Sequence, residues 1–199
     1  GPPRAASSGR QDAVRLHSPL HHATTRHAAL IETLVEGADE RDRLLHAVER
    51  VPCVARKAQW AQSWIDSPTA TFATRLVAFA VVEGIFFSGS FCAIFWLKKR
   101  GRMPGLCVSN SLIARDEGMH QEFATHLYAT HLSHKLSEET VHALVGEAVE
   151  HEVAFCRDAL PVSLLGMNAD DMATYIRFVA DRLLTELGVR KLYHAANPF

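Results

Sequence analysis

A chain of 199 residues is long enough for one domain with a substantial core. Its 48% apolar and 22% charged residues are ordinary for a globular protein, and a formal net charge of -1 gives no electrostatic reason to expect nucleic acid or an anionic membrane as a partner. The four cysteines, Cys53, Cys92, Cys107 and Cys156, form no C-x-x-C pair. They predict buried free thiols in a reducing, cytoplasmic location.

Residues 1–28 differ in composition from the rest of the chain. They are rich in arginine and histidine, contain one acid, Asp12, and show no apolar period. This pattern predicts a disordered arm, unrelated to the domain over residues 29–199. Its Arg-rich character loosely matches a transit peptide, but no amphipathic pattern accompanies it.

From Leu30 onward the apolar residues have a helical period, and no convincing alternating strand occurs. Asp39 or an adjacent residue is predicted to cap a first helix, which Pro52 interrupts or restarts. Trp60 and Trp64 then share a helix face at i, i+4, which predicts core packing.

A long apolar run, Leu76–Leu97, follows a predicted cap at residues 67–69 and ends at the Gly- and Pro-rich residues 100–105. Further helices are expected over about 106–132, from Ser137 to Pro161, and from a cap at Asn168 to a stop at Gly188. The chain is therefore predicted to be all-α, a helical bundle with short connections.

The run Leu76–Leu97 permits two interpretations. It is long enough to cross a bilayer, and the basic residues 98–100 resemble a stop-transfer flank. Against this, Glu83 would cost ~2.5–3.5 kcal/mol near the middle of a membrane, and residues 88–90 dilute the hydrophobicity. A helix that is apolar all round is also typical of the centre of a large bundle.

Glu117 and His120 lie three residues apart in a helical segment, so their side chains project together as a chelating pair. Glu83 is the one acid in the apolar run, and burial would be costly unless it met a cation. A metal ion held by Glu117 and His120 is one such cation. The alternative is a protonated or hydrogen-bonded core acid, and spacing alone does not exclude it.

Apolar side chains surround these ligands. Phe87 and Phe91 follow Glu83 at i+4 and i+8, and Ile113 precedes Glu117 by four residues. Two facing helices of this kind describe half of a carboxylate-bridged dimetal site, in which Glu-x-x-His motifs complete the coordination. Carboxylates with imidazole suit iron or manganese.

Several longer strings extend this pattern: Val81–Phe91, Phe95–Gly101, Met103–Leu106, Ala114–His120, Ala159–Pro161, Gly166–Asn168, Phe178–Leu183 and Asn197–Phe199. From about residue 30 to 199, the chain closely resembles the small, radical-generating subunit of eukaryotic-type class I ribonucleotide reductase. The resemblance implies an incomplete ferritin-like bundle that corresponds to the C-terminal half to two-thirds of that subunit. It also favours a buried helix over a membrane span.

The resemblance implies a diiron centre, with manganese as an alternative, that oxidises a tyrosine by means of O2. It also implies a homodimer and a large-subunit partner for the reduction of ribonucleotides to deoxyribonucleotides. The matching positions are Glu83, Glu117 and His120 as metal ligands, Phe87, Phe91 and Ile113 as the apolar pocket around the radical, and Asp116 in the radical-transfer path. For Asp116 the alternative is a surface acid beside Arg115.

The first half of the family's ligand set has no match here. The ungapped alignment places Leu20, Ala23 and His27 where the Glu, His and radical Tyr should stand, and His21 and His22 lack a nearby bridging carboxylate. Half a ligand set should leave two acids close together, so that at least one pKa rises or the helices separate. We therefore expect no stoichiometric dimetal centre and no tyrosyl radical in this chain alone.

Two other functions remain open from the sequence. One is a non-catalytic interaction module that keeps the dimer-forming helices and pairs with an intact small subunit. The other is a membrane-anchored protein, based on Leu76–Leu97.

Overall fold

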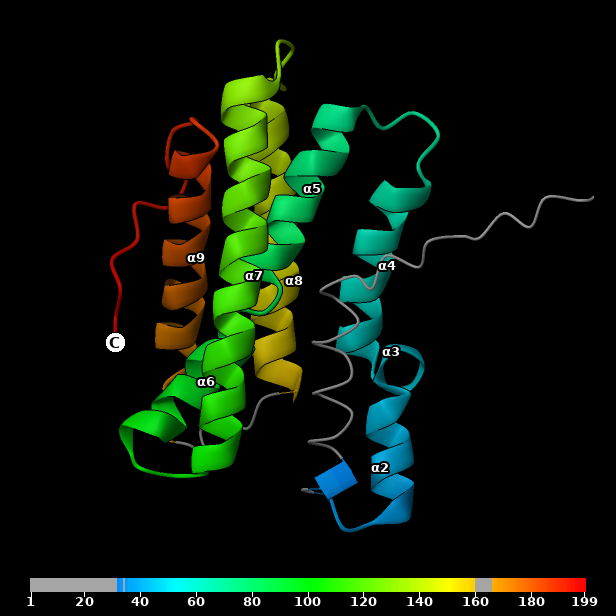
Figure 1. Ribbon diagram of the computed structural model, residues 1–199, viewed down its shortest axis with the longest axis vertical. Coiled ribbons are helices and arrows are strands. Elements are labelled where there is room, and N and C mark those ends of the chain that lie inside the picture. The colour runs from blue at the N-terminus through cyan, green and yellow to red at the C-terminus, as the bar shows by residue number, and fades with distance from the viewer. Residues whose placement is uncertain (1–31, 34, 160–165) are drawn as a thin grey trace, which may run out of the picture.

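The computed structural model describes residues 32–33, 35–159 and 166–199, and every regular element within these ranges is a helix (Figure 1). The helices in chain order are α2 Ala38–Leu45, α3 Ala47–Arg50, α4 Pro52–Asp66, α5 Phe72–Ile85, α6 Ser88–Lys99, α7 Pro104–His131, α8 Glu138–Ala159 and α9 Ala169–Glu186. The all-α prediction is confirmed. The disordered arm predicted for residues 1–28 lies outside the described residues.

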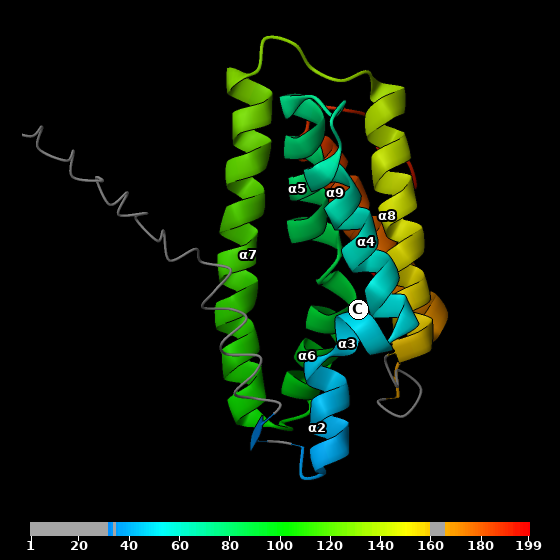
Figure 2. The same cartoon turned by 90° about the vertical axis from the view of Figure 1, so that its right-hand side faces the viewer.

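The long helices α7, α8 and α9 run along the long axis and surround α5 (Figure 1). In the turned view, α7 and α8 stand on opposite sides of α5, and a short connection joins them at one end (Figure 2). Helix α4 packs against α5 and α8. Helices α2 and α3, which precede α4 in the chain, extend from its first residue away from the bundle. Helix α5 is thus the central element, in contact with α4, α7, α8 and α9.

The core follows from the apolar spacing of these helices. Fully buried side chains recur at i, i+4 and i+8 on α5, at Val77, Val81 and Ile85, and they pack with apolar residues of α8 and α9. Burying each such side chain contributes about 1.5–3 kcal/mol. The same spacing that predicted a helix therefore also supplies its tertiary stabilisation.

Several predicted helix boundaries are confirmed. Pro52 is the first residue of α4, where its missing N–H costs nothing. The side chain of Asn168 caps α9 by accepting from the Asp170 N–H at 2.8 Å. Gly188 has a φ of 78° just after α9, a conformation in which glycine has no steric penalty.

Two predicted caps are wrong. The cap of α2 is Gly37, and Asp39 lies in the first turn, where its charge favours the helix dipole. The cap of α5 is Thr71, whose hydroxyl accepts from the Thr74 N–H at 3.1 Å, whereas Ser67 ends α4. Serine and threonine hydroxyls are equivalent acceptors, so the sequence could not decide which of them begins the helix.

The continuous helix predicted over residues 76–97 is also wrong, because the chain breaks between α5 and α6. The backbone groups that the break frees find other partners: the Ser88 hydroxyl donates to the Ile85 carbonyl at 2.7 Å, and the Gly89 N–H donates to Glu152 Oε1 at 3.0 Å. A buried break is tolerated only when such groups are paired. Apolar periodicity is the same on both sides of the break and could not reveal it.

Among the described residues, Phe72–Lys99 is the one segment long and apolar enough to cross a membrane. Of its most apolar 18-residue stretch, 67% is buried inside the bundle, and α5 makes the central contacts of the core. Core helices of soluble proteins share this composition, so the membrane interpretation receives little support from it.

We expect Gly89→Ala to destabilise the chain by ~1–3 kcal/mol, because a Cβ there would lie 2.2 Å from Cys156 Sγ and 2.9 Å from Glu152 Oε1. Gly118→Ala is the matched control, since a Cβ at Gly118 meets nothing within 4 Å and alanine favours a helix interior. Urea unfolding of both variants measures the difference, and equal stabilities would contradict the close approach of α6 to α8.

Candidate metal centre

The three predicted ligands meet between α5 and α7. Glu83 lies in the last turn of α5, and Glu117 and His120 lie one turn apart in the middle of α7. His120 Nδ1 is 3.1 Å from Glu117 Oε2 and 3.3 Å from Glu83 Oε2. One donor atom from each residue lies within 4.8 Å of the other two. Helix α7 thus supplies a chelating pair, and α5 supplies a third ligand from a distant part of the sequence.

The two carboxylates are almost completely buried. The side chains of Glu83 and Glu117 are 1% and 5% exposed, whereas that of His120 is 21% exposed. Burial, followed by the hydrogen bond to Glu117 and the charge of that residue, raises the pKa of Glu83 from 4.5 to about 9. Without a bound cation, the pair therefore retains a proton at neutral pH. The raised pKa of Glu83 agrees with the rise expected from the sequence.

This donor set fits a divalent metal ion. Two carboxylate oxygens and one imidazole nitrogen converge on a common point, and hard oxygen donors with imidazole suit iron or manganese. A cation at this point would replace the proton that now offsets the repulsion between the acids. Three candidate ligands from two helices correspond in number to half the ligand set of a four-helix dimetal site, and the described residues contain no second cluster of this kind.

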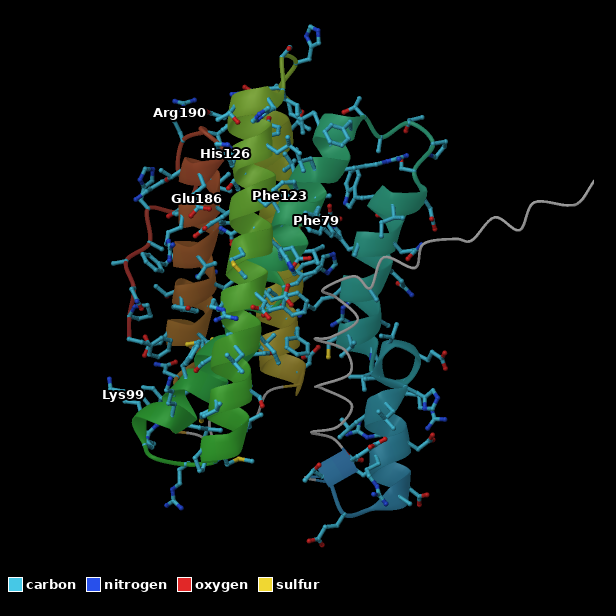
Figure 3. All side chains as sticks on the ribbon, in the orientation of Figure 1. Phe79, Lys99, Phe123, His126, Glu186 and Arg190 are labelled. Atoms are coloured by element: carbon cyan, nitrogen blue, oxygen red, sulfur yellow. The ribbon has the colours of Figure 1, made fainter. Side chains whose placement is uncertain are left out.

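One side of Glu83 faces a small pocket between α4 and α5. The pocket has a volume of about 180 Å³ and is lined mainly by apolar groups, including Trp64, Phe79 and Val82. Phe79 itself is 37% exposed on α5 and is labelled in Figure 3. The site therefore has a polar side, formed by α7, and an apolar side toward α4.

Two of the residues predicted to form the radical pocket, Phe87 and Phe91, lie at or just after the break. Phe87 and Phe91 have ring centroids 6.0 Å apart, and both lie after the end of α5. The i+4 and i+8 spacing from Glu83 assumed one continuous helix, whereas α5 ends at Ile85, before both phenylalanines. Ile113 is 2% exposed, one turn before Glu117 on α7. The assignment of a radical pocket to these residues stays a prediction.

Asp116 lies on α7, beside the ligand Glu117. Its carboxylate is 3.2 Å from the Arg115 guanidinium, and its side chain is 31% exposed. The sequence prediction of a role in radical transfer and the alternative of a surface acid are both compatible with this position. The role in radical transfer stays a prediction.

The sequence prediction missed a further buried acid, Glu152, and its partner Lys57. Glu152 is fully buried on α8, and its Oε2 lies 2.6 Å from the Lys57 ammonium of α4. Burial raises the pKa of Glu152, against the lowering effect of Lys57. The sequence did carry a signal for the burial of Glu152. It lies four residues after the buried Ala148 on α8, and therefore on the same buried helix face.

All of these residues lie within a stretch that matches a known sequence family. The family described as "Ribonucleotide reductase, small chain" matches residues 22–198. The chain belongs to this family. It is 61% identical over 184 residues to the ribonucleoside-diphosphate reductase small chain of Nicotiana tabacum and 56% identical over 178 residues to that of Trypanosoma brucei brucei.

Solved structures of ribonucleotide reductases have the same fold. The Rnr4 homodimer of Saccharomyces cerevisiae matches 78% of this chain and 49% of its own chain, with a TM-score of 0.74 and 40% identity. The R2 subunit from Clostridium botulinum matches 85% of this chain and 56% of its own, with a TM-score of 0.72 and 20% identity. The ferritin-like bundle predicted from the sequence is thereby confirmed.

This chain spans about half the length of the small chains that it matches, 54% of the tobacco protein and 52% of the trypanosome protein. Small chains of this family use a metal centre, and the Glu83–Glu117–His120 cluster is a possible site for a metal ion.

We expect the metal-free chain to lose stability as the pH rises, and Glu83→Gln to remove this loss. The pKa of Glu83 is raised in the folded state, so between pH 4.5 and about 9 folding retains a proton that the unfolded chain has released. At pH 8, the metal-free Gln variant should be more stable than wild type by ~1–3 kcal/mol. Urea unfolding at pH 5 and pH 8, with chelator present, measures this difference.

Glu147→Gln is the control, because Glu147 is an exposed acid of the neighbouring helix α8. It should leave the pH dependence unchanged. The same pH dependence in wild type and Glu83→Gln would mean that the buried acids carry no extra proton.

Proposed function

We propose that this chain is part of the small subunit of a ribonucleoside-diphosphate reductase, and that Glu83, Glu117 and His120 hold a metal ion of its iron centre. The observation that carries the proposal is the convergence of these three donors in a chain of this family. When bound, such a centre would supply the oxidation of a tyrosine needed for the reduction of ribonucleotides to deoxyribonucleotides. The large subunit would be the partner, in the cytoplasm, where buried free thiols persist.

Each of the three candidate ligands has a definable role in that site. Glu83 and Glu117 would neutralise the ion, and the low exposure of both would keep water from it. His120 Nδ1 already points at both carboxylates, so it needs no rearrangement to bind.

Tyr128 is two turns beyond His120, about 12 Å along the helix, and its hydroxyl accepts from the Leu136 N–H. This position does not favour Tyr128 as the oxidised residue.

We expect this chain alone to bind fewer than two irons and to form no tyrosyl radical, because the described residues provide half of a dimetal ligand set. Anaerobic loading with Fe(II), exposure to O2, metal analysis and electron paramagnetic resonance make the measurement. His120→Ala should weaken binding of one Fe(II) or Co(II) by about 10-fold or more, whereas His142→Ala, which changes an α8 histidine outside the cluster, should not. Two irons per chain with a radical signal would contradict the half-site.

A second candidate function is a non-catalytic module that pairs with an intact small subunit. It is favoured by a stripe of exposed apolar side chains on α7, formed by Val108, Leu112, Met119 and Phe123, which are 41–66% exposed. Their spacing of four, seven and four residues places them on one helix face. Phe123 is labelled on this helix in Figure 3. Exposed apolar patches of this kind are typical of interaction surfaces.

If the α7 stripe mediates pairing, Leu112→Glu with Phe123→Glu should weaken association with an intact small subunit by about 10-fold or more. Leu192→Glu is the control, because Leu192 is 40% exposed but lies in the C-terminal segment, outside the stripe. Light scattering with and without the intact subunit measures association. Equal association of both variants would rule out the stripe as the contact surface.

A further inference from the structure

The break between α5 and α6 is held by a buried ion pair from two other helices. Lys57 of α4 donates to the Phe86 carbonyl, which is freed where α5 ends. Glu152 of α8 accepts from the Gly89 N–H, which lies in the first turn of α6, where an N–H has no partner within its own helix. The Lys57 ammonium and Glu152 Oε2 are 2.6 Å apart, close enough for an ion pair though not aligned as a hydrogen bond. One pair of charges thus serves both ends of the break.

The surroundings make this pair specific. Glu152 is fully buried, Lys57 is 13% exposed, and the ammonium lies 3.9 Å from the centre of the Phe155 ring. Gly89 lets the backbone of α6 approach, since any Cβ there would collide with Cys156 and Glu152. A carboxylate this deeply buried is tolerated only with a cation and hydrogen-bond donors around it. Loss of either charge would leave the other without its partner.

We propose that the Lys57–Glu152 pair is a positioning device for the metal centre, because it fixes the end of α5 and therefore the direction of Glu83. Glu83 is three residues before Phe86, within the last turn that the Lys57 contact closes. Neither member of the pair belongs to the Glu83–Glu117–His120 cluster, so both act through the backbone. The inference rests on the metal site proposed above.

The test compares two ion pairs that join the same helices. Lys57→Met with Glu152→Gln removes the buried pair without leaving an unpaired charge, and Gln keeps an acceptor for Gly89 N–H. Arg56→Met is the matched control, because Arg56 and Asp158 form an exposed pair between α4 and α8, 3.0 Å apart. Binding of Co(II) is titrated well below the melting temperature of each variant. The double variant should bind about tenfold more weakly, and the control less than twofold.

A second measurement needs no metal. Amide hydrogen exchange at Phe87, Ser88 and Gly89 should become at least about tenfold faster in the double variant, while amides in the middle of α9 keep wild-type rates. Glu152→Gln alone is the milder variant if the double one does not fold. It should weaken Co(II) binding about threefold and accelerate the same amides.

The outcomes separate this inference from the proposed function. Folded variants with wild-type Co(II) affinity, or exchange that is equally fast throughout, would show that the pair only adds general stability. If wild type binds no Co(II), the metal-site proposal fails, and so does positioning for a metal. Faster exchange confined to the break would then support only the role of the pair in holding α5.

Discussion

Two carboxylates, Glu83 and Glu117, are buried side by side between α5 and α7, and the rest of the site depends on how their charge is balanced. Two acids in low-dielectric surroundings cannot both ionise unless a cation lies between them. In the metal-free chain the pair retains a proton, and His120 Nδ1 lies within 3.3 Å of both carboxylates. A metal ion would provide the same balance more strongly, since it carries two charges.

At the break between α5 and α6, the charge of a buried acid is balanced in a different way. There Glu152 is neutralised by Lys57, a cation that belongs to the chain and is held by packing on Phe155. One buried acid thus has a permanent partner and serves the backbone, while the other pair lacks one and is available for an exchangeable ion. The Lys57–Glu152 pair and the proposed metal site thus differ in the source of the positive charge, which is a lysine of the chain in the first and a bound ion in the second.

The local features were predictable from the sequence. Glu117 and His120 are three residues apart on one helix, so their convergence needs only helical geometry. The bundle and most helices follow from apolar spacing. The break after Ile85 did not, because it depends on Lys57, 29 residues from Phe86, and on Glu152, 63 residues from Gly89. Nothing in a uniformly apolar run records such distant contacts.

The two candidate functions are linked by the geometry of α7. At 100° per residue, the α7 stripe lies about 60–120° around the helix from His120, on the side opposite Glu117. His120 therefore stands at the boundary between the buried ligands and the exposed apolar face, in agreement with its intermediate exposure of 21%. A partner helix that covered the α7 stripe would therefore also pass beside the exposed side of His120.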